Sequence, residues 1–338
     1  MTHPAPTGWS RVTAKLPRTT SRLVRRLALA SLISQIMIVV TGGAVRLTAS
    51  GLGCPEWPRC TATSIVNTPE MGIHGVIEFG NRLLTFVLTA IAIAMVVSLW
   101  NLRKERKDLF RLAIALAAGI PAQAILGGIT VLTQLNPWVV GWHFIVSMVL
   151  IVLATVLLNR VRLSTAQAAS SASPLGSRLL RQILTAAAAL TAITVFLGVI
   201  VTGSGPHAGD AGAARNNLDP DLMTRIHAAP VYLLVLTVAV ALVLVYRESS
   251  APRLRKSVEL LAAVVLAQGA VGYLQHFLHL PVALVALHML GASVLTAAMA
   301  NSLYLAVSRK ERATLTTNSA GAGSAGAGVA PADLRDAR

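Results

Sequence analysis

Three histidines of this 338-residue chain, His143, His227 and His288, lie inside long apolar runs and near the start of each run. Ionisable side chains inside a membrane-spanning segment are costly, so they indicate function. One histidine from each of two helices, facing each other across a bundle, is the axial pair that a six-coordinate haem iron requires. We expect His227 and His288 to form such a pair. The alternative is that each ring only hydrogen-bonds a neighbouring helix.

A second polar group surrounds Glu78, the one acidic side chain well inside an apolar run. Asn81 follows at a spacing of i, i+3, which places both residues on one helix face, and Arg82 comes next. The functional interpretation is a carboxylate beside a bound substrate, and the structural alternative is a buried Glu78–Arg82 ion pair. His74 is expected in a loop, and it extends the same face if the helix starts early.

The elements that must position these residues are membrane-spanning helices. The chain is 54% hydrophobic and 12% charged, whereas a soluble domain is about 25% charged. An apolar run of about 20 residues crosses a bilayer. The sequence therefore predicts an all-α membrane protein with eight transmembrane helices, at roughly 27–46, 77–100, 110–132, 138–159, 182–203, 226–246, 257–277 and 281–307.

The basic residues are distributed unevenly between the two sides of these helices. Of the 29 Lys and Arg, 24 fall in segments predicted to share one side: 1–26, 101–112, 159–181, 246–256 and 308–338. Cytoplasmic loops carry such an excess, so both termini are predicted to be cytoplasmic. Topology thus explains the net charge of +16, and we expect no nucleic-acid partner.

The only two cysteines, Cys54 and Cys60, lie in TASGLGCPEWPRC at 48–60, a loop that this topology places outside. Thiols oxidise in that compartment, so a disulfide is the main interpretation. A redox-active pair is the sharper alternative. A metal pair is disfavoured because no further Cys or His completes a closed site.

The chain also repeats itself. Residues 122–150 and 267–295 align without a gap, and His143 matches His288 among seven identities. VVTGG at 39–43 resembles IVTGS at 200–204, each taken to end the first helix of its half. EFGNR at 78–82 aligns with TRIHA at 224–228, which places Asn81 opposite His227.

The repeat predicts two tandem four-helix bundles. The predicted parts are a cytoplasmic segment (1–26), a first half (27–159), a cytoplasmic linker (160–181), a second half (182–307) and a disordered cytoplasmic tail (308–338). Two histidines would saturate an iron in the second half, which suits electron transfer. The first half offers one His, one Glu and one Asn, so an iron there would have a weak or open side. This asymmetry is typical of a membrane oxidoreductase.

Roughly residues 25–308 resemble the haem A synthase family. The resemblance is carried by TGGAVRLTASGLGCPEWPRC at 41–60, EFGNR at 78–82, TGSGPHAGD at 202–210 and the single histidines. It implies eight helices in two halves, in a bacterial cytoplasmic membrane with the cysteine loop outside. It also implies an enzyme that oxidises a methyl group of haem O to a formyl group, which gives haem A for terminal oxidases.

By position, the resemblance implies that His227 and His288 hold a resident haem b, and that His143 is an axial ligand of the substrate haem. Glu78 would lie near the reacting group, and Cys54 and Cys60 would form the outer disulfide. The haem O synthase and the terminal oxidase assembly machinery are implied partners, besides the lipid bilayer. The electron donor stays open.

The chain departs from the family at Asn81, because the family pattern is Glu-x-x-His-Arg. An asparagine there could hydrogen-bond, leave a five-coordinate iron, or leave the ligand role to His74. Arg46, Arg82 and Arg225 are candidates to bind haem propionates, since Arg binds carboxylates bidentately. The alternative is that these arginines extend to the membrane surface.

A non-catalytic membrane haem protein is the competing hypothesis. A cytochrome b type electron-transfer protein or a haem carrier would also use a bis-His site and a duplicated bundle. The cysteine loop, Glu78 and the asymmetry between the halves favour the enzyme, because a simple two-haem cytochrome would keep His at position 81.

Overall fold

A computed structural model describes residues 16–163 and 174–308 of the chain. These residues form helices and no β-strand, and eight of the helices are long and apolar enough to cross a membrane, as the sequence predicts. The eight are α2 (Arg22–Leu47), α3 (Gly72–Ser98), α4 (Lys107–Leu132), α5 (Pro137–Arg160), α7 (Arg178–Ser204), α8 (Pro220–Arg247), α9 (Pro252–Phe277) and α10 (Val282–Val307). Two short 3-10 helices, η1 (Pro69–Met71) and η2 (Trp100–Leu102), flank α3.

Several helices begin earlier than their apolar runs. Helix α2 begins at Arg22 rather than 27, and α8 begins at Pro220 rather than 226. The physical reason is capping: the side chain of Ser21 accepts from Val24 N, and Asp219 accepts from Leu222 N at 2.6 Å. Side chains that accept the first free N–H groups start a helix within polar sequence that a hydropathy criterion leaves out.

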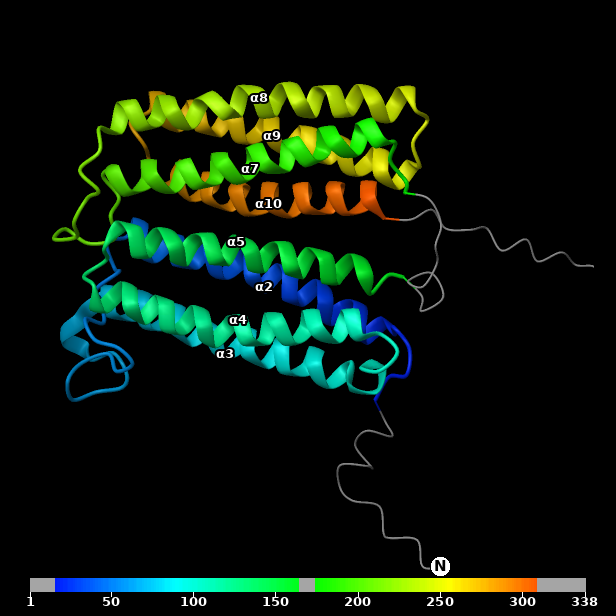
Figure 1. The fold of residues 1–338 in the computed structure, drawn as a ribbon. Helices are drawn as coiled ribbons and strands as arrows, with labels where there is room; N and C mark the ends of the chain where they lie inside the picture. Colours follow the sequence, from blue (N-terminus) through cyan, green and yellow to red (C-terminus); the bar gives the residue numbers. More distant parts are fainter. Residues whose placement is uncertain (1–15, 164–173, 309–338) are drawn as a thin grey trace, which may run out of the picture.

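The eight helices lie side by side in two groups of four (Figure 1). In the first group α2 contacts α3 and α5, and α4 also contacts both α3 and α5. In the second group α7 and α9 each contact both α8 and α10. Within each ring, α3 lies diagonally from α5, and α8 lies diagonally from α10. The groups meet through α2 and α5 on one side and α7 and α10 on the other.

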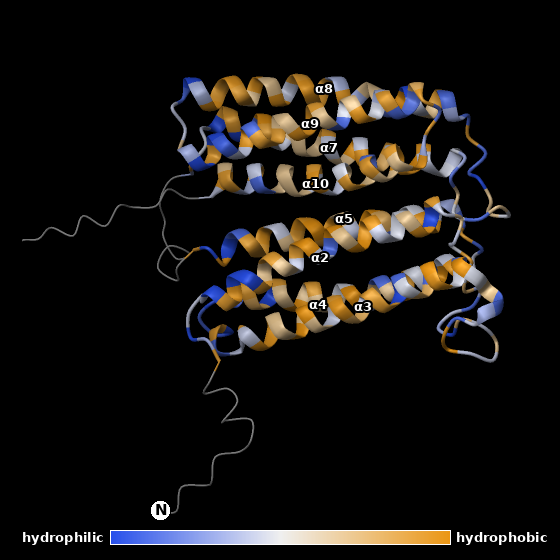
Figure 2. Cartoon of the chain, turned by 180° about the vertical axis from the view of Figure 1, so that it is seen from behind, coloured by the Kyte–Doolittle hydropathy of each residue, from blue (hydrophilic) through white to orange (hydrophobic). Residues whose placement is uncertain are grey.

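Hydrophobic residues dominate the middle of the helices, and hydrophilic residues gather toward their ends (Figure 2). Each group has its own buried apolar core, and large side chains such as Phe86, 71% exposed, point away from both. This outward apolar surface is expected of helices that face lipid rather than water. The eight-span prediction therefore agrees with both the length and the surface of the helices.

The two ends of the bundle differ in their loops. The Cys-loop end holds residues 48–71, 133–136, 205–219 and 278–281, and the linker end holds residues 16–21, 99–106, 161–163, 174–177 and 248–251. The predicted tail from 309 and the middle of the predicted linker, 164–173, lie outside the described residues. The predicted bounds of the two halves, and their origin by tandem duplication, stay predictions.

Candidate functional site

The three intramembrane histidines all lie toward the Cys-loop end. His227 is on α8 and His288 on α10, the two helices at opposite corners of the second ring. Both residues are half-buried. His143 is on α5 in the first ring. The fold therefore places His227 and His288 on diagonal helices of one bundle and His143 in the other bundle.

Each of these rings lies against a glycine of a neighbouring helix. A methyl group built on Gly198 of α7 would lie 3.1 Å from His227 Cε1. The corresponding distances are 3.4 Å from Gly272 to His288 Cε1 and 3.3 Å from Gly127 to His143 Cε1. A larger residue would crowd the imidazole, so the glycines leave room for it beside the backbone.

A glutamine fixes the backbone at two of the histidines. Gln268 Nε2 donates to the carbonyl oxygen of His288 at 3.1 Å, and Gln123 Nε2 donates to the carbonyl oxygen of His143 at the same distance. The two glutamines align in the sequence repeat. The repeat thus extends from residue identities to matched contacts in space.

The histidines fit a haem because one ring nitrogen of each is available. No described residue forms a hydrogen bond with Nε2 of His143, His227 or His288, and the Nδ1 atoms of His143 and His288 are also buried without a partner. Buried polar atoms are nearly always paired, so such unpaired rings indicate a ligand that binds there. Within the described residues no group of three or more His, Cys, Asp or Glu could hold a bare metal ion. A porphyrin supplies the other iron ligands, so one or two axial histidines suffice.

Asn81 occupies the corner of the first ring that His227 occupies in the second. It is on α3, diagonal to the His143 helix, and its Oδ1 is buried without a partner. A methyl group built on Gly42 of α2 would lie 4.0 Å from Asn81 Nδ2, which parallels the pairing of Gly198 with His227. Asn81 and His227, which the sequence alignment pairs, thus lie on corresponding helices of the two rings, with an amide in the first and an imidazole in the second.

The repeated VVTGG and IVTGS segments are not in register with the helix ends. Gly43 precedes the last residue of α2, Leu47, by four positions, whereas Ser204 is the last residue of α7. The expectation that each segment ends its helix was wrong for the first half. Helix α2 continues through Arg46, whose side chain donates to the carbonyls of His207 and Thr202.

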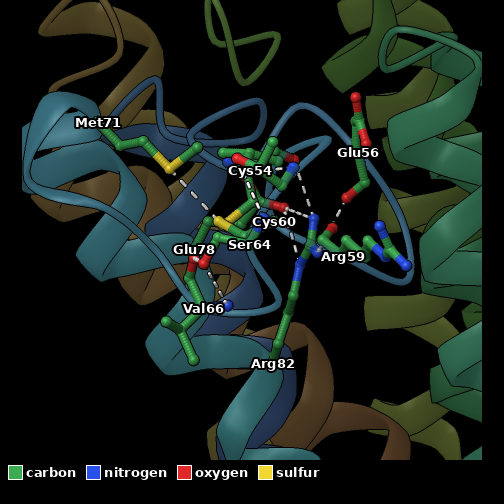
Figure 3. The surroundings of a disulfide bond; sticks show 11 residues. Cys54, Glu56, Arg59, Cys60, Ser64, Val66, Met71, Glu78 and Arg82 are labelled. Atoms are coloured by element: carbon green, nitrogen blue, oxygen red, sulfur yellow. Dashed lines mark hydrogen bonds and ion pairs between the residues drawn. A yellow bond between two sulfur atoms is a disulfide. The ribbon is translucent and has the colours of Figure 1, made fainter.

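Glu78 and Arg82 hold the loop that contains the cysteines (Figure 3). Glu78 is 5% exposed; its Oε2 accepts from Cys54 N at 2.6 Å, and its Oε1 accepts from Arg82 Nε at 3.1 Å. Arg82 Nη2 donates to Glu78 Oε1 and to the Cys54 carbonyl, and Nη1 donates to the carbonyls of Glu56 and Arg59. These bonds use all the N–H donors of a guanidinium. Arg82 therefore retains no free donor for a propionate.

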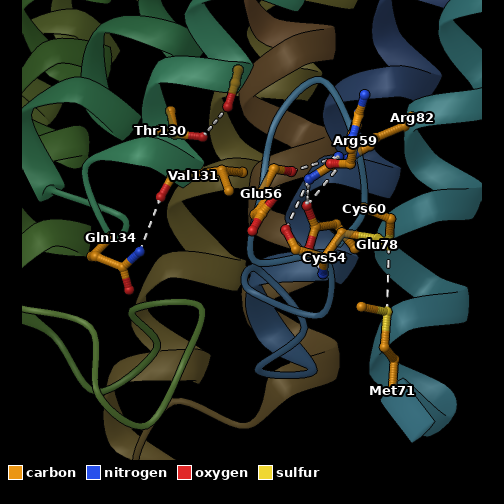
Figure 4. A network of polar contacts seen from close by, with 11 residues as sticks. Cys54, Glu56, Arg59, Cys60, Met71, Glu78, Arg82, Thr130, Val131 and Gln134 are labelled. Carbon is orange, nitrogen blue, oxygen red and sulfur yellow. Dashed lines mark hydrogen bonds and ion pairs between the residues drawn. A yellow bond between two sulfur atoms is a disulfide. The ribbon is translucent and has the colours of Figure 1, made fainter. Parts of the chain in front are cut away.

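The two cysteines form a disulfide, and both side chains are fully buried. Met71 at the start of α3 lies beside it, with 3.4 Å between Cys60 Sγ and Met71 Sδ. The loop also packs on α4, since a methyl group on Gly128 would lie 2.3 Å from the Trp57 ring. Figure 4 shows the loop next to the last turn of α4. Gly128 follows Gly127, the glycine that faces His143, so the loop contacts α4 at about the depth of that histidine.

The remaining candidate arginines differ from Arg82. Arg46 donates through Nε to the His207 carbonyl at 2.6 Å and through Nη2 to the Thr202 carbonyl at 2.9 Å. Its other donors are free of hydrogen bonds to described residues, and its charged neighbour is Arg215. Arg225 is exposed on α8, and none of the described ion pairs includes it or Arg46. These two arginines keep donors available for an anion.

The early start of α3 moves His74 from the expected loop into the first helical turn, one turn from Glu78. Its Nδ1 lies 2.9 Å from Ser50 Oγ, and the residue is exposed. His207, in the loop after α7, contacts the Leu280 carbonyl through Nε2 at 3.0 Å. Sequence reasoning assigned no role to the glutamines or to Gly42 and Gly198, although the identity of Gln123 and Gln268 in the repeat was a usable signal.

The fold and the site define a multi-pass helical membrane protein with intramembrane histidines toward the end of the bundle that carries a disulfide-bonded loop. The sequence pattern of the COX15-CtaA family, described as cytochrome oxidase assembly protein, matches residues 25–300. The chain therefore belongs to this family, which bears out the resemblance stated from its motifs.

Individual relatives agree. The chain is 30% identical over 131 residues to "Heme A synthase" of Bacillus pumilus (strain SAFR-032), a match that covers 37% of this chain and 41% of the relative. It is 29% identical over 132 residues to "Heme A synthase" of Lysinibacillus sphaericus (strain C3-41), which covers 38% and 42%. The chain thus spans less than half the length of the curated relatives that it matches.

Proposed function

We propose that this chain is a membrane oxidoreductase that oxidises a methyl group of haem O to a formyl group and so makes haem A. The observation that carries the proposal is the repeated histidine site: His288 and His143 have the same glutamine and glycine contacts, but only the second bundle completes the pair with another histidine. Family membership and relatives named "Heme A synthase" support it.

The second bundle would hold a resident haem b through His227 and His288. That group supplies one-electron transfer when bound. The chain contributes two imidazoles from diagonal helices and the bond from Gln268 that fixes the backbone at His288. A bundle with both ligand positions filled by the protein leaves no place for a substrate at the iron.

The first bundle would hold haem O, with His143 as its only protein imidazole. Asn81 at the opposite corner can hydrogen-bond but is a poor iron ligand, so that side stays accessible to the reaction. The free donors of Arg46, on α2, suit a propionate carboxylate of this haem, whereas Arg225, on α8, could serve only a haem of the second bundle. Arg82 cannot bind a propionate in the same way, because all its N–H donors already form hydrogen bonds.

Glu78 acts in this proposal as a positioning residue. Both its oxygens are engaged, one by Cys54 N and one by Arg82, so the carboxylate anchors the Cys loop over the first bundle. A fixed loop would exclude bulk water from the site and orient the substrate. The loop would lie on the outer side of a bacterial cytoplasmic membrane, because the basic linker end suits the cytoplasm.

The test is haem extraction and chromatography of membranes that contain this chain together with a source of haem O. A haem A peak that requires the chain supports the synthase. Unconverted haem O beside a folded chain with bound haem b would instead support the second candidate, a non-catalytic bis-His cytochrome or haem carrier. That candidate shares one observation with the synthase, the placement of His227 and His288 on diagonal helices of one bundle.

A further inference from the structure

A groove of about 580 Å³ lies along one face of α7 at the linker end, far along the helix from the histidines. Its polar part is formed by Arg178, Arg181, Gln182 and Thr185. The spacing of these residues places them on one side of the helix. All but Arg181 are exposed, so the groove opens to the surroundings of the bundle rather than to its core.

The arginines of this groove form no ion pair with described residues, although Glu248 accepts from the Ser177 hydroxyl at the N-terminus of the same helix. Arg178 and Arg181 take part in none of the ion pairs among the described residues, and the first turn of α7 has no acidic residue. Arg181 Nε is buried without a hydrogen-bond partner. A buried charged donor left unpaired is costly, so this atom indicates an acceptor that binds in the groove. The N-terminus of α7 adds a partial positive charge at the same place.

The lower part of the groove is apolar. Ala186 and Ala189 continue the same face of α7 toward the middle of the span, and Val307, 49% exposed, closes it from α10. The small alanines leave a furrow beside the helix. A ligand that fits must therefore carry an anionic group at one end and an apolar chain at the other.

We propose that this groove binds one anionic glycerophospholipid. The phosphate lies against Arg178 and Arg181, and an acyl chain follows Ala186 and Ala189 into the bilayer. Basic pockets between helices at the cytoplasmic side are a known means of recognising anionic headgroups. The site is separate from the histidines, so it does not depend on the proposed function.

General topology makes a different prediction about these arginines. If Arg178 and Arg181 serve only the positive-inside distribution, any basic residue at the linker end should attract anionic lipid equally. Arg111 is the matched control: it lies in the first turns of α4 at the same end, is exposed, and does not line this groove.

The experiment is native mass spectrometry of the purified full chain in detergent, titrated with phosphatidylglycerol or with phosphatidylcholine of the same acyl chains. We expect one retained phosphatidylglycerol and weaker binding of phosphatidylcholine. Each arginine near a membrane surface contributes about a fivefold change in affinity. R178Q/R181Q should therefore weaken retention by about 25-fold, and R111Q should leave it unchanged.

A second variant keeps the test valid if the charge variant does not fold. Ala186→Phe fills the apolar part of the groove without a change in charge, and it should also reduce phosphatidylglycerol retention. Equal retention of the two lipids, an equal loss in R111Q, or full retention in Ala186→Phe would each overturn the proposal.

Discussion

The side-chain amide of Gln123 donates to the backbone carbonyl of His143, with 3.1 Å between Nε2 and O. Gln268 makes the same bond to His288. In each bundle this bond joins the third helix to the fourth and fixes the height at which the histidine lies. The two halves differ in most residues, but both use a glutamine to fix the backbone of a histidine. They differ on the diagonal helix, where Asn81 of the first half occupies the position of His227 in the second.

Replacement of either histidine of the second bundle should abolish haem b binding. His227→Ala or His288→Ala removes one of the two proposed axial ligands, so the absorbance of a six-coordinate haem should disappear from the purified protein. His276→Ala is the control, because His276 is exposed near the end of α9. Unchanged spectra in both ligand variants would refute the assignment.

Gln268→Leu should weaken haem binding without preventing folding. The substitution removes the bond that fixes the His288 backbone, and loss of outer-shell support for a metal ligand typically costs at least tenfold in affinity. Titration of the haem-free protein, followed by absorbance, measures this loss. Gln123→Leu provides the comparison, since it should leave the haem b signal of the second bundle intact.

Gly198→Ala should displace the His227 ring. Its new methyl group would lie 3.1 Å from Cε1, closer than most such contacts allow. We expect a lower haem content per purified chain, measured by pyridine haemochrome absorbance. Gly269→Ala is the matched control in the same half, because nothing lies within 4 Å of its added methyl group. Equal haem content in the two variants would show that close approach at Gly198 has no role.

Arg82→Ala should release the Cys loop. The substitution breaks a largely buried ion pair and leaves Glu78 uncompensated, a change that costs roughly 3 kcal/mol or more. Thermal unfolding should shift downward, and limited proteolysis should cut faster within residues 48–68. Arg59→Ala is the control, since Arg59 makes one side-chain bond, to the Ala62 carbonyl. Equal proteolysis rates in the two variants would contradict the proposal that Arg82 holds the Cys loop.

The disulfide can be tested by thiol labelling of the isolated protein. Without reductant, Cys54 and Cys60 should remain unlabelled even after denaturation, because both sulfurs are bonded to each other. Denaturation in the presence of reductant should then expose two thiols. Labelling of both cysteines in unreduced, denatured protein would show that the bond does not persist.

Much of the architecture follows from the sequence, because membrane insertion depends on local composition. Long apolar runs predict eight spanning helices, and the eight helices are present. The gapless alignment of 122–150 with 267–295 matched His143 with His288, and the echo at 78–82 identified Asn81 as the residue opposite His227. The eight-span prediction is confirmed because the composition of one segment is enough to predict a spanning helix. The matching of the two halves stays a prediction, which the equivalent bonds of Gln123 and Gln268 support.

Only the tertiary structure decided what those residues contact. The i, i+4 spacing permitted a Glu78–Arg82 pair, but its use as an anchor for Cys54 depends on how a loop folds back over α3. The structure alone shows that Gly42 lies beside Asn81 and that Gly198 lies beside His227, because these contacts depend on how neighbouring helices are rotated and shifted against each other. Sequence periodicity fixes which face a residue occupies, whereas contacts between helices depend on packing that no single segment encodes.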